Sequence, residues 1–334
     1  MVLYCCLPSS PAISLLVSSF SEVMFDALVE EAEDILGLDL NPLQVGAQRQ
    51  ASLGPGSPEG RCRALLIGIN YTGSAAELKG CVNDVKSVLF AIKDMGFTTD
   101  RVRTLVEDTR MDYFYSLPTK ANILSSLNWL VESSQSGDSL FLHFSGHGAS
   151  VKDSSGDEDD GMDEAMAPLD YLEAGLITDD EIYDILIRRL PKGVRLTAVL
   201  DCCHSGTLLD LPYLLSGTEQ SLFVSGVPDR TARSEVEAEV VMFSGCRDNQ
   251  TSSDVADTSM FGSTNNSAGG ACTNAFLEVL YGRKNSKKIT YITLLQKMRS
   301  SLRQKGFQQV PQLSATRRLN LYSDFDLFKP LSTR

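Results

Sequence analysis

The three histidines of the chain stand close to residues that could perform chemistry with them. His143 and His147 lie near the end of one short apolar run, and His204 directly follows Cys203 at the end of another. Runs of this length suit buried strands, and reactive groups gather at the carboxyl ends of the strands in an open parallel sheet. We therefore expect His147 and Cys203 to lie close together in space, although they are far apart in the sequence.

A cysteine beside a histidine forms a nucleophile with its base. The imidazole takes the thiol proton, and the resulting thiolate attacks a carbonyl carbon. Gly146, Gly148 and Gly206 flank the two candidate residues. Because glycine has no side chain, these positions let a substrate approach the backbone and let amide N–H groups point at a developing oxyanion. The pattern favours nucleophilic catalysis on a carbonyl group.

Two other interpretations of the same residues stay open at this point. A buried cysteine or histidine is often a packing residue with no chemical role. A zinc site would also use these residue types, taken from His143, His147, Cys202, Cys203 and His204. However, zinc-binding cysteines are commonly separated by two or more residues, whereas Cys202 and Cys203 are adjacent. The spacing and the flanking glycines favour the nucleophile with its base.

The elements that must position these residues alternate between strand and helix patterns. Short apolar runs predict strands, and apolar residues at helical spacing predict helices between them. Strands separated by helices form parallel βαβ units with helices on both faces of the sheet. The sequence therefore predicts an α/β fold with a mixed, mostly parallel sheet between helices. The expected strands are 64–69, 102–106, 140–144, 196–200 and 240–243, and the expected helices are 82–95, 121–131, 179–189, 271–281 and 289–304.

Breaks in composition divide the chain into four segments. The first is a leader with one predicted helix, 21–37, and a turn-rich end at Gly54-Pro55-Gly56-Ser57-Pro58. A second break, rich in Ser, Gly, Thr and Pro, lies at 216–234. The expected segments are a leader over 1–60, a large catalytic part over 61–215, a linker over 216–238, and a small part of the same domain over 239–334.

The motifs taken together resemble the metacaspases, which are caspase-like cysteine peptidases. His147-Gly148 after a Ser-Gly turn and the run Asp201-Cys202-Cys203-His204-Ser205-Gly206 carry the resemblance. It also includes Gly80-Cys81-Val82-Asn83-Asp84, the stretch from Phe243 to Ser252 and the stretch from Gln309 to Ser314. The likeness spans roughly residues 61–320 and is similar to the compact, trypanosomatid-like type. It implies a caspase-like, three-layer arrangement of the predicted α/β fold.

The resemblance implies a role for each residue around the expected site. Cys203 is the nucleophile and His147 is the base, while the N–H groups of Gly148 and Cys203 form the oxyanion hole. The pocket for a substrate Arg or Lys side chain is expected to consist of Cys81, Asp84, Ser145 and Asp201. Paired carboxylates bind such cations through charge-assisted hydrogen bonds and should reject Asp. Taken alone, Asp84 is equally well explained as a helix-start residue that accepts hydrogen bonds from amides.

An acidic segment lies between the two expected strand ends. Asp153–Glu164 holds seven carboxylates, which a solvated surface loop would also show. The EF-hand pattern does not fit, because no glycine falls at the sixth position. The resemblance implies instead a calcium site gathered from separate segments, with the ligands Asp163, Asp179, Asp180 and Asp210. Calcium is expected to activate the enzyme by tying together the segments on both sides of the catalytic turn.

These features predict a calcium-dependent cysteine endopeptidase that cleaves protein or peptide substrates after Arg or Lys. The alternative is a calcium-responsive, caspase-like scaffold without proteolytic activity, and the intact Cys203 and His147 argue against it. A net charge of −13 makes nucleic acid an unexpected partner. The basic block over 283–318, with ten bases and no acid, is interpreted mainly as exposed helix faces.

Regulation and location are predicted from the remaining features. The acidic leader helix is expected to dock on the basic Lys297–Arg318 region and shield the site, with self-cleavage candidates at Arg49, Arg61, Arg230 and Arg233. Eight cysteines without a stapling pattern indicate reduced thiols. The leader lacks a basic start, and no apolar stretch approaches the ~18 residues of a membrane span. We expect a cytoplasmic or endosome-associated protein, not a secreted one, and the resemblance indicates a monomer.

Overall fold

The computed structural model describes most of the chain that follows the leader. The described residues are 61–98, 101–111, 113–152, 162–202, 208–217, 222–226, 235–245, 254–255, 269–281 and 288–327. The chain divides into two units between Ser52 and Leu53, and all described residues belong to the second unit. The expected leader helix, 21–37, and most of the acidic segment lie outside the described residues.

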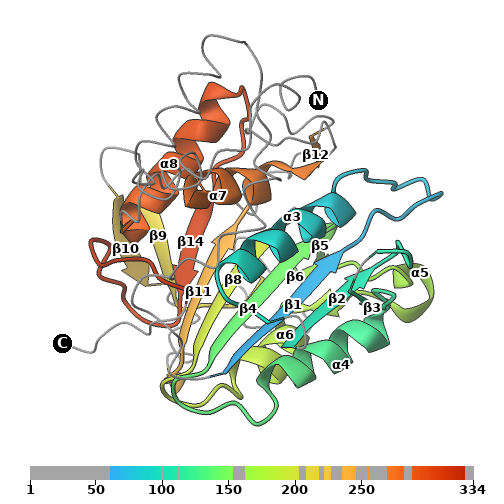
Figure 1. Ribbon diagram of the computed structural model, residues 1–334, viewed down its shortest axis with the longest axis horizontal. Coiled ribbons are helices and arrows are strands. Elements are labelled where there is room, and N and C mark those ends of the chain that lie inside the picture. The colour runs from blue at the N-terminus through green and yellow to red at the C-terminus, as the bar shows by residue number, and fades with distance from the viewer. Residues whose placement is uncertain are drawn as a thin grey trace, which may run out of the picture. The chain divides into compact units, whose positions relative to one another are not determined.

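One nine-stranded sheet forms the centre of this unit (Figure 1). Six neighbouring strands, in the order β3-β2-β1-β4-β8-β11, are parallel, and β14, β9 and β10 continue the sheet with antiparallel pairings. The sheet therefore joins strands of the predicted large and small parts. The strands are β1 Cys62–Gly68, β2 Val102–Val106, β3 Phe114–Ser116, β4 Ser139–Ser145, β8 Arg195–Asp201, β9 Tyr213–Gly217, β10 Leu222–Gly226, β11 Glu239–Ser244 and β14 Gln312–Ala315.

Helices cover both faces of the sheet, and each face has its own apolar core (Figure 1). Successive strand side chains point to opposite faces, so Ala64 and Leu66 pack with one set of helices and Leu65 and Ile67 with the other. The first face carries α3 Cys81–Asp94, α7 Ala271–Tyr281 and α8 Tyr291–Gln304, and the second carries α4 Lys120–Val131, α6 Asp179–Ile182 and the π-helical turn η3 Tyr183–Ile187.

Side-chain caps mark where several helices begin. Thr119 accepts a hydrogen bond from Asn122 N at the start of α4, and Thr290 does the same for Thr293 N at α8. Thr178 and Glu181 form a reciprocal capping box at α6. These bonds satisfy amide groups that have no partner within the first helical turn. The Thr178–Glu181 pair thereby places Asp179 and Asp180 in the first turn of α6.

Smaller elements extend from the carboxyl edge of the main sheet. β5 Gly148–Lys152, β6 Met162–Met166 and β7 Ile177–Thr178 form a three-stranded antiparallel sheet directly after β4. The short pair β12 Asp254–Val255 and β13 Gly269–Gly270 precedes α7, and the short helix α5 Tyr171–Ala174 precedes β7. The residues that follow the expected histidine strand, β4, are thus held in a second, smaller sheet.

The main strands and helices agree with the sequence-based expectations to within two residues at most of their ends. The differences lie in short or polar segments. The predicted helix 179–189 is α6 followed by a π-helical turn, in which Arg188 N reaches Tyr183 O five residues back. The predicted break at 216–234 contains β10, which pairs with β9. Short strands of mixed polarity such as β5 to β7 give too weak an alternation to be recognised.

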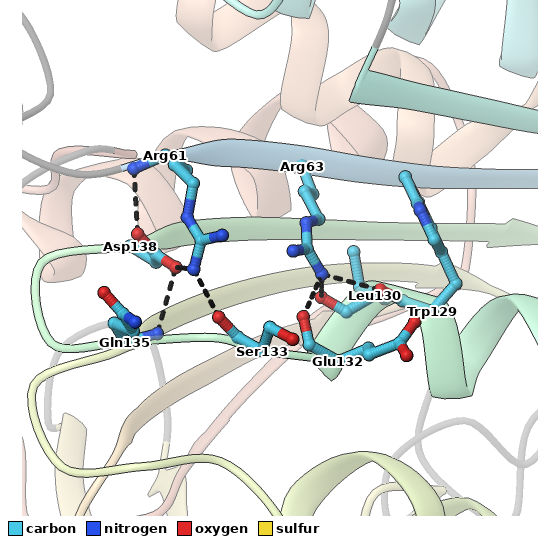
Figure 2. A network of polar contacts seen from close by, with 8 residues as sticks. All are labelled: Arg61, Arg63, Trp129, Leu130, Glu132, Ser133, Gln135 and Asp138. Carbon is cyan, nitrogen blue, oxygen red and sulfur yellow. Dashed lines mark hydrogen bonds and ion pairs between the residues drawn. The ribbon is translucent and has the colours of Figure 1, made fainter.

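The amino end of β1 is fixed by two arginines (Figure 2). The Arg61 guanidinium forms an ion pair with Asp138 at 3.0 Å, and its backbone N–H donates to the same carboxylate. Arg63 Nη1 donates to the carbonyls of Trp129 and Glu132 at 2.8 and 2.5 Å, which satisfies carbonyl groups at the end of α4. These contacts connect the first strand to the turn that leads into β4.

A buried ion pair joins β8 to β11. Arg195 Nη1 lies 2.5 Å from Glu239 Oε1, and both side chains are at most 2% exposed. Arg195 Nη2 also donates to the Tyr291 hydroxyl on α8 at 2.6 Å. Removing one partner would leave an unpaired buried charge, so we expect such a change to lower the free energy of unfolding of the domain.

The basic block is less exposed than expected. Arg299 on α8 is buried, and its Nε donates to Pro311 O at 2.8 Å. Lys305 Nζ forms an ion pair with Glu278 on α7 at 2.8 Å. Both side chains thus bind other parts of the domain, so for them the expectation of exposed helix faces is wrong. Within the described part of the chain, no helix combines the length and apolarity that crossing a bilayer requires.

Candidate active site

Two of the expected site residues, Ser145 and Asp201, lie at the carboxyl ends of adjacent parallel strands, and the neighbouring strand ends at Gly68. Gly68 on β1, Ser145 on β4 and Asp201 on β8 occupy the same register position. Ile69 N donates to Ser145 O, and Gly146 N donates to Asp201 O, which extends the pairing past the strand ends. The sheet therefore presents these three positions side by side, as the alternation of strands and helices predicts.

The first residue of α3 crosses close over the end of β1. A side chain at Gly68 would place its first carbon 2.4 Å from Cys81 O, so only glycine permits this approach. Cys81 is itself buried at the start of the helix. The close crossing brings Asp84, one turn further along α3, over the end of the sheet.

Asp84 is buried and is bound by groups outside its own helix. Ser145 Oγ donates to Asp84 Oδ2 at 2.7 Å, and Gly270 N donates to both carboxylate oxygens at 2.9 and 2.8 Å. Asn274 Nδ2 donates to Oδ1 at 3.2 Å. No side-chain cap is formed at the start of α3. Asp84 therefore accepts amide hydrogen bonds from a separate segment, and its place in a substrate pocket stays a prediction.

Asp201 approaches the same point from β8. Thr273 N donates to Asp201 Oδ2 at 2.7 Å. A side-chain carbon at Gly270 would lie 2.3 Å from Asp201 Oδ2 and 2.9 Å from Asp84 Oδ2. The two buried carboxylates thus flank Gly270 at the start of α7. The structure brings Asp84, Ser145 and Asp201 together, as expected for one pocket.

His147 lies just beyond the end of β4 and is half-buried. Its Nε2 lies 2.8 Å from Ala76 O, and its ring packs on the ring of Tyr71 with centroids 4.7 Å apart. A carbonyl oxygen can only accept a hydrogen bond, so this contact requires a proton on Nε2. In the neutral ring the lone pair is then on Nδ1, which is the nitrogen that can take a proton from a nucleophile.

The expected nucleophile, Cys203, lies outside the described residues, as does His204. Cys202, the residue before it, is fully buried, as expected for the packing member of the pair. Gly148, whose N–H is one expected oxyanion donor, begins β5 opposite Met166. The structure therefore places His147 beside the strand end that leads to Cys203, and the roles of His147, Cys203 and Gly148 stay predictions.

His143 occupies a different environment from His147. It is fully buried on β4, and its Nε2 lies 3.2 Å from Thr273 Oγ1. Burial lowers the pKa of His143 to about 3, so the ring is neutral at ordinary pH. Among the described residues, no group of three or more His, Cys, Asp or Glu side chains could hold a metal ion, and two of the zinc candidates lie outside that part.

The four predicted calcium ligands are found around α6 and the small sheet. Asp163 on β6, Asp179 on α6 and Asp210 are buried, and Asp180 is half-buried. Asp179 accepts hydrogen bonds from Glu164 N and Asp180 N, both at 2.9 Å. Burial, followed by the nearby negative charge of Asp210, raises the pKa of Asp179 to about 8. Carboxylate oxygens are the ligands that calcium prefers, but no three acidic side chains of the described residues lie in an arrangement that could hold a metal ion as they stand, so the calcium site stays a prediction.

Several residues of the site were not expected from the sequence. Tyr71 and Ala76 reach His147 from the loop between β1 and α3, and Gly270, Thr273 and Asn274 reach the pocket acids from the start of α7. Most of these contacts use backbone N–H or C=O groups, which every residue type carries. Only the hydroxyl of Tyr71 and the amide of Asn274 had a side-chain signal in the sequence.

Comparisons with known proteins agree with this architecture. The family model described as "Metacaspase, peptidase C14 domain" matches residues 62–212. Metacaspase-5 of Trypanosoma brucei brucei is 46% identical over 82% of this chain and 54% of that protein, so the chain spans little more than half of this relative. Metacaspase-2 of the same organism is 44% identical over 81% of this chain and 77% of that protein.

Among solved structures, protein GSU0716 from Geobacter sulfurreducens is similar, with a TM-score of 0.56 and 25% identity. The likeness covers 81% of this chain and 100% of that chain. The α/β fold with a mixed, mostly parallel sheet flanked by helices is thereby confirmed. The relatives at 44–46% identity, one of them covered over 77% of its length, show that the chain belongs to the metacaspase family, peptidase C14.

Proposed function

We propose that this chain is a calcium-dependent cysteine endopeptidase that cleaves after Arg or Lys through Cys203 and His147. The observation that carries the specificity is the pair Asp84 and Asp201, which flank Gly270 beside the strand end that bears His147. The described hydrogen bonds to these carboxylates come from neutral amides and a hydroxyl. Such donors orient a carboxylate without cancelling its charge, which suits a pocket for a basic side chain.

The reaction proceeds in two transfers. His147 Nδ1 takes the Cys203 thiol proton, and the thiolate attacks the carbonyl carbon of the scissile bond. The tetrahedral intermediate collapses as the C–N bond breaks and His147 returns the proton to the leaving amine. Water then gives a proton to His147 and attacks the carbonyl carbon of the Cys203 thioester. The C–S bond breaks, the Cys203 sulfur takes the proton back from His147, and the acid product is released. The N–H groups of Gly148 and Cys203 stabilise the oxyanion in both steps.

The decisive test of this function is turnover of paired peptide reporters. Reporters that end in Arg or Lys before the scissile bond should be cleaved, and a matched Asp reporter should not be. His147→Ala and Cys203→Ala should both abolish turnover, whereas Cys202→Ala should keep most of it. Efficient cleavage of the Asp reporter would contradict the pocket, and an active Cys203→Ala variant would contradict the assigned nucleophile. An unaltered chain that binds calcium but cleaves none of the reporters would instead support the alternative of a scaffold without proteolytic activity.

Calcium dependence is proposed from the acidic group around Asp179. Asp163, Asp179, Asp180 and Asp210 would supply oxygen ligands after moving closer together, since they do not form a metal-binding group as they stand. The raised pKa of Asp179 indicates that its surroundings disfavour its negative charge. Bound calcium would supply positive charge that offsets the negative charges of these four carboxylates. Activity should rise with free calcium and not with magnesium, which prefers a smaller octahedral site. Full activity in a chelator would contradict the proposal.

The segment boundaries, regulation and assembly are also proposed on this basis. The leader over 1–60 would act as a regulatory segment ahead of the catalytic parts, 61–215 and 239–334, which the 216–238 linker joins. Among the proposed self-cleavage points, Arg61 is held by Asp138, so cleavage there would have to break this ion pair. Arg49, Arg230 and Arg233 lie outside the described residues. We expect a monomer in the cytoplasm or at endosomes that does not bind nucleic acid.

A further inference from the structure

We infer that Tyr71 is a positioning residue for His147 and that Glu107 holds Tyr71 in place. The inference rests on the proposed role of His147 as the base. It concerns a residue in the loop between β1 and α3 and a residue at the end of β2, neither of which is expected to touch the substrate. Together they would fix the direction in which the His147 ring presents Nδ1.

Tyr71 contacts His147 in two ways. The two rings pack with centroids 4.7 Å apart at an interplanar angle of 36°, and the Tyr71 hydroxyl accepts a hydrogen bond from His147 N at 3.0 Å. The same hydroxyl donates to Ala167 O at 2.7 Å. Burial raises the pKa of Tyr71 well above its usual value, so this hydroxyl stays protonated and keeps donating. Tyr71 thus holds both the ring and the backbone of His147.

The backbone of Tyr71 adopts a conformation that such a residue rarely takes. Its φ of 52° lies in the left-handed region, which is unfavourable for a bulky side chain unless the surroundings impose it. The side chain is only 2% exposed. An unfavourable backbone at a buried residue in contact with the catalytic base suggests that the conformation serves the site.

Glu107 supplies the group that imposes this conformation. Its carboxylate accepts hydrogen bonds from three successive backbone N–H groups: Asn70 N, Tyr71 N at 2.9 Å and Thr72 N at 2.9 Å. Consecutive N–H groups that converge on one anion form a stable concave arrangement of the backbone. Glu107 directly follows β2, which pairs with β1. One carboxylate at the end of β2 therefore holds three successive residues of the loop.

The same loop also provides the second contact to the His147 ring. Ala76 O accepts from His147 Nε2 at 2.8 Å. Within the loop, Asn70 O accepts from Leu78 N at 2.7 Å, and Asn70 Oδ1 accepts from Val82 N in the first turn of α3. The ring of His147 is thus clamped between Tyr71 on its face and Ala76 at Nε2. These two contacts favour the tautomer of His147 that carries its proton on Nε2. Nδ1 is then unprotonated and can act as the base.

A fixed ring direction affects the chemical step more than substrate binding. Misplacing a catalytic group by about 1 Å can cost on the order of 100-fold in rate. The pocket acids Asp84 and Asp201 are bound by the α7 start and Ser145, so their positions do not depend on Tyr71 through any of the contacts described. Loss of the clamp should therefore lower kcat and leave KM nearly unchanged.

Two conservative variants test the inference. Tyr71→Phe keeps the ring and removes the hydroxyl, and Glu107→Gln keeps the shape of the side chain and removes its charge. Each variant should lower kcat on an Arg reporter about tenfold and keep KM within twofold of the unaltered chain. The rate is divided by the concentration of active sites, which is titrated with a thiol-reactive peptide. The titration removes any contribution from unfolded protein, which a purely structural role would produce. The double variant should be no slower than the slower single variant, because both residues act through one contact.

Glu77→Gln is the matched control. Glu77 lies in the same loop, is exposed, and accepts from Gly73 N at 2.9 Å, but has no described contact with Tyr71 or His147. Its kcat should equal that of the unaltered chain. Unchanged kcat per titrated site in Tyr71→Phe, while His147→Ala is inactive, would overturn this inference and leave the proposed function intact. Retained turnover in His147→Ala would overturn both.

Discussion

Two pairs of buried carboxylates, Asp84 with Asp201 and Asp179 with Asp210, lie in different surroundings. Asp84 and Asp201 face the start of α7, where backbone amides and the hydroxyl of Ser145 donate to them. Asp179 also receives two amide donors, but burial and the charge of Asp210 still raise its pKa to about 8. The first pair is held by donors from a separate segment. Asp179 of the second pair lies where its negative charge is disfavoured, first because it is buried and second because Asp210 is near.

The difference follows from the elements that supply the donors. The pocket pair stands at the amino end of α7, a helix of 11 residues whose dipole favours nearby negative charge. Asp179 stands at the start of α6, which has only four residues before its π-helical turn. Acidic residues are buried in both places, but only the pocket pair is supported by a long helix. This comparison predicts that the pocket is pre-formed and that the second pair depends on a cation.

The largest effect is expected at the pocket. Asp84→Asn keeps the size of the side chain and removes its charge, so kcat/KM on Arg and Lys reporters should fall at least 100-fold, equivalent to about 2.7 kcal/mol. Asp84→Ala should lose the same activity and also stability, by about 1–3 kcal/mol, because the buried N–H of Gly270 loses its acceptor. Steady-state kinetics and urea unfolding of both variants separate charge from structure.

The outcome that would contradict this comparison is an Asp84→Asn variant that cleaves the Arg reporter as fast as the unaltered chain. Charge would then be irrelevant to the pocket, and Asp84 would serve only to hold the start of α7.

A smaller effect is expected where the two pocket acids meet. Gly270→Ala would place a methyl carbon 2.3 Å from Asp201 Oδ2 and 2.9 Å from Asp84 Oδ2, closer than such contacts allow. One carboxylate must move, so KM for basic reporters should rise about tenfold while the domain stays folded. Gly226→Ala is the control, because a carbon there meets no atom within 4 Å. Equal KM values in the two variants would show that the spacing of the acids is not critical.

The contrast between the pairs also shows what the sequence could predict. The strand that ends in Asp201 and the helix that carries Asp84 were expected within two residues of their observed ends, because their apolar periodicity is strong. The contact of both acids with Gly270 could not be expected, because it depends on how a distant segment folds back and on backbone N–H groups. Likewise, the left-handed φ of Tyr71 has no signature in residue type.

The smallest effect concerns the second pair and its dependence on pH. The pKa of Asp179 is raised in the folded chain above its usual 3.8, so the folded state binds this proton more tightly than the unfolded state. The associated stability is fully present below pH 4 and is lost as the pH rises to about 8. His143 contributes the opposite trend, because its lowered pKa removes stability as the pH falls below 6.5. A single stability curve therefore mixes both groups.

The difference between Asp179→Asn and the unaltered chain isolates the carboxyl group, since His143 is common to both. Without calcium, Asp179→Asn should be more stable at pH 8 by about 1–3 kcal/mol, at about 1.4 kcal/mol per pKa unit, and this gain should shrink toward pH 5. The variant should also lose the stabilisation that calcium gives the unaltered chain.

Asp184→Asn is the control, because Asp184 is exposed and pairs with Arg188 at 2.8 Å. A surface pair of this kind contributes little, so that variant should keep both the pH dependence and the calcium response. An Asp179→Asn variant that is less stable at pH 8 would show that the second pair is already compensated without a cation, and the distinction between the two pairs would fail.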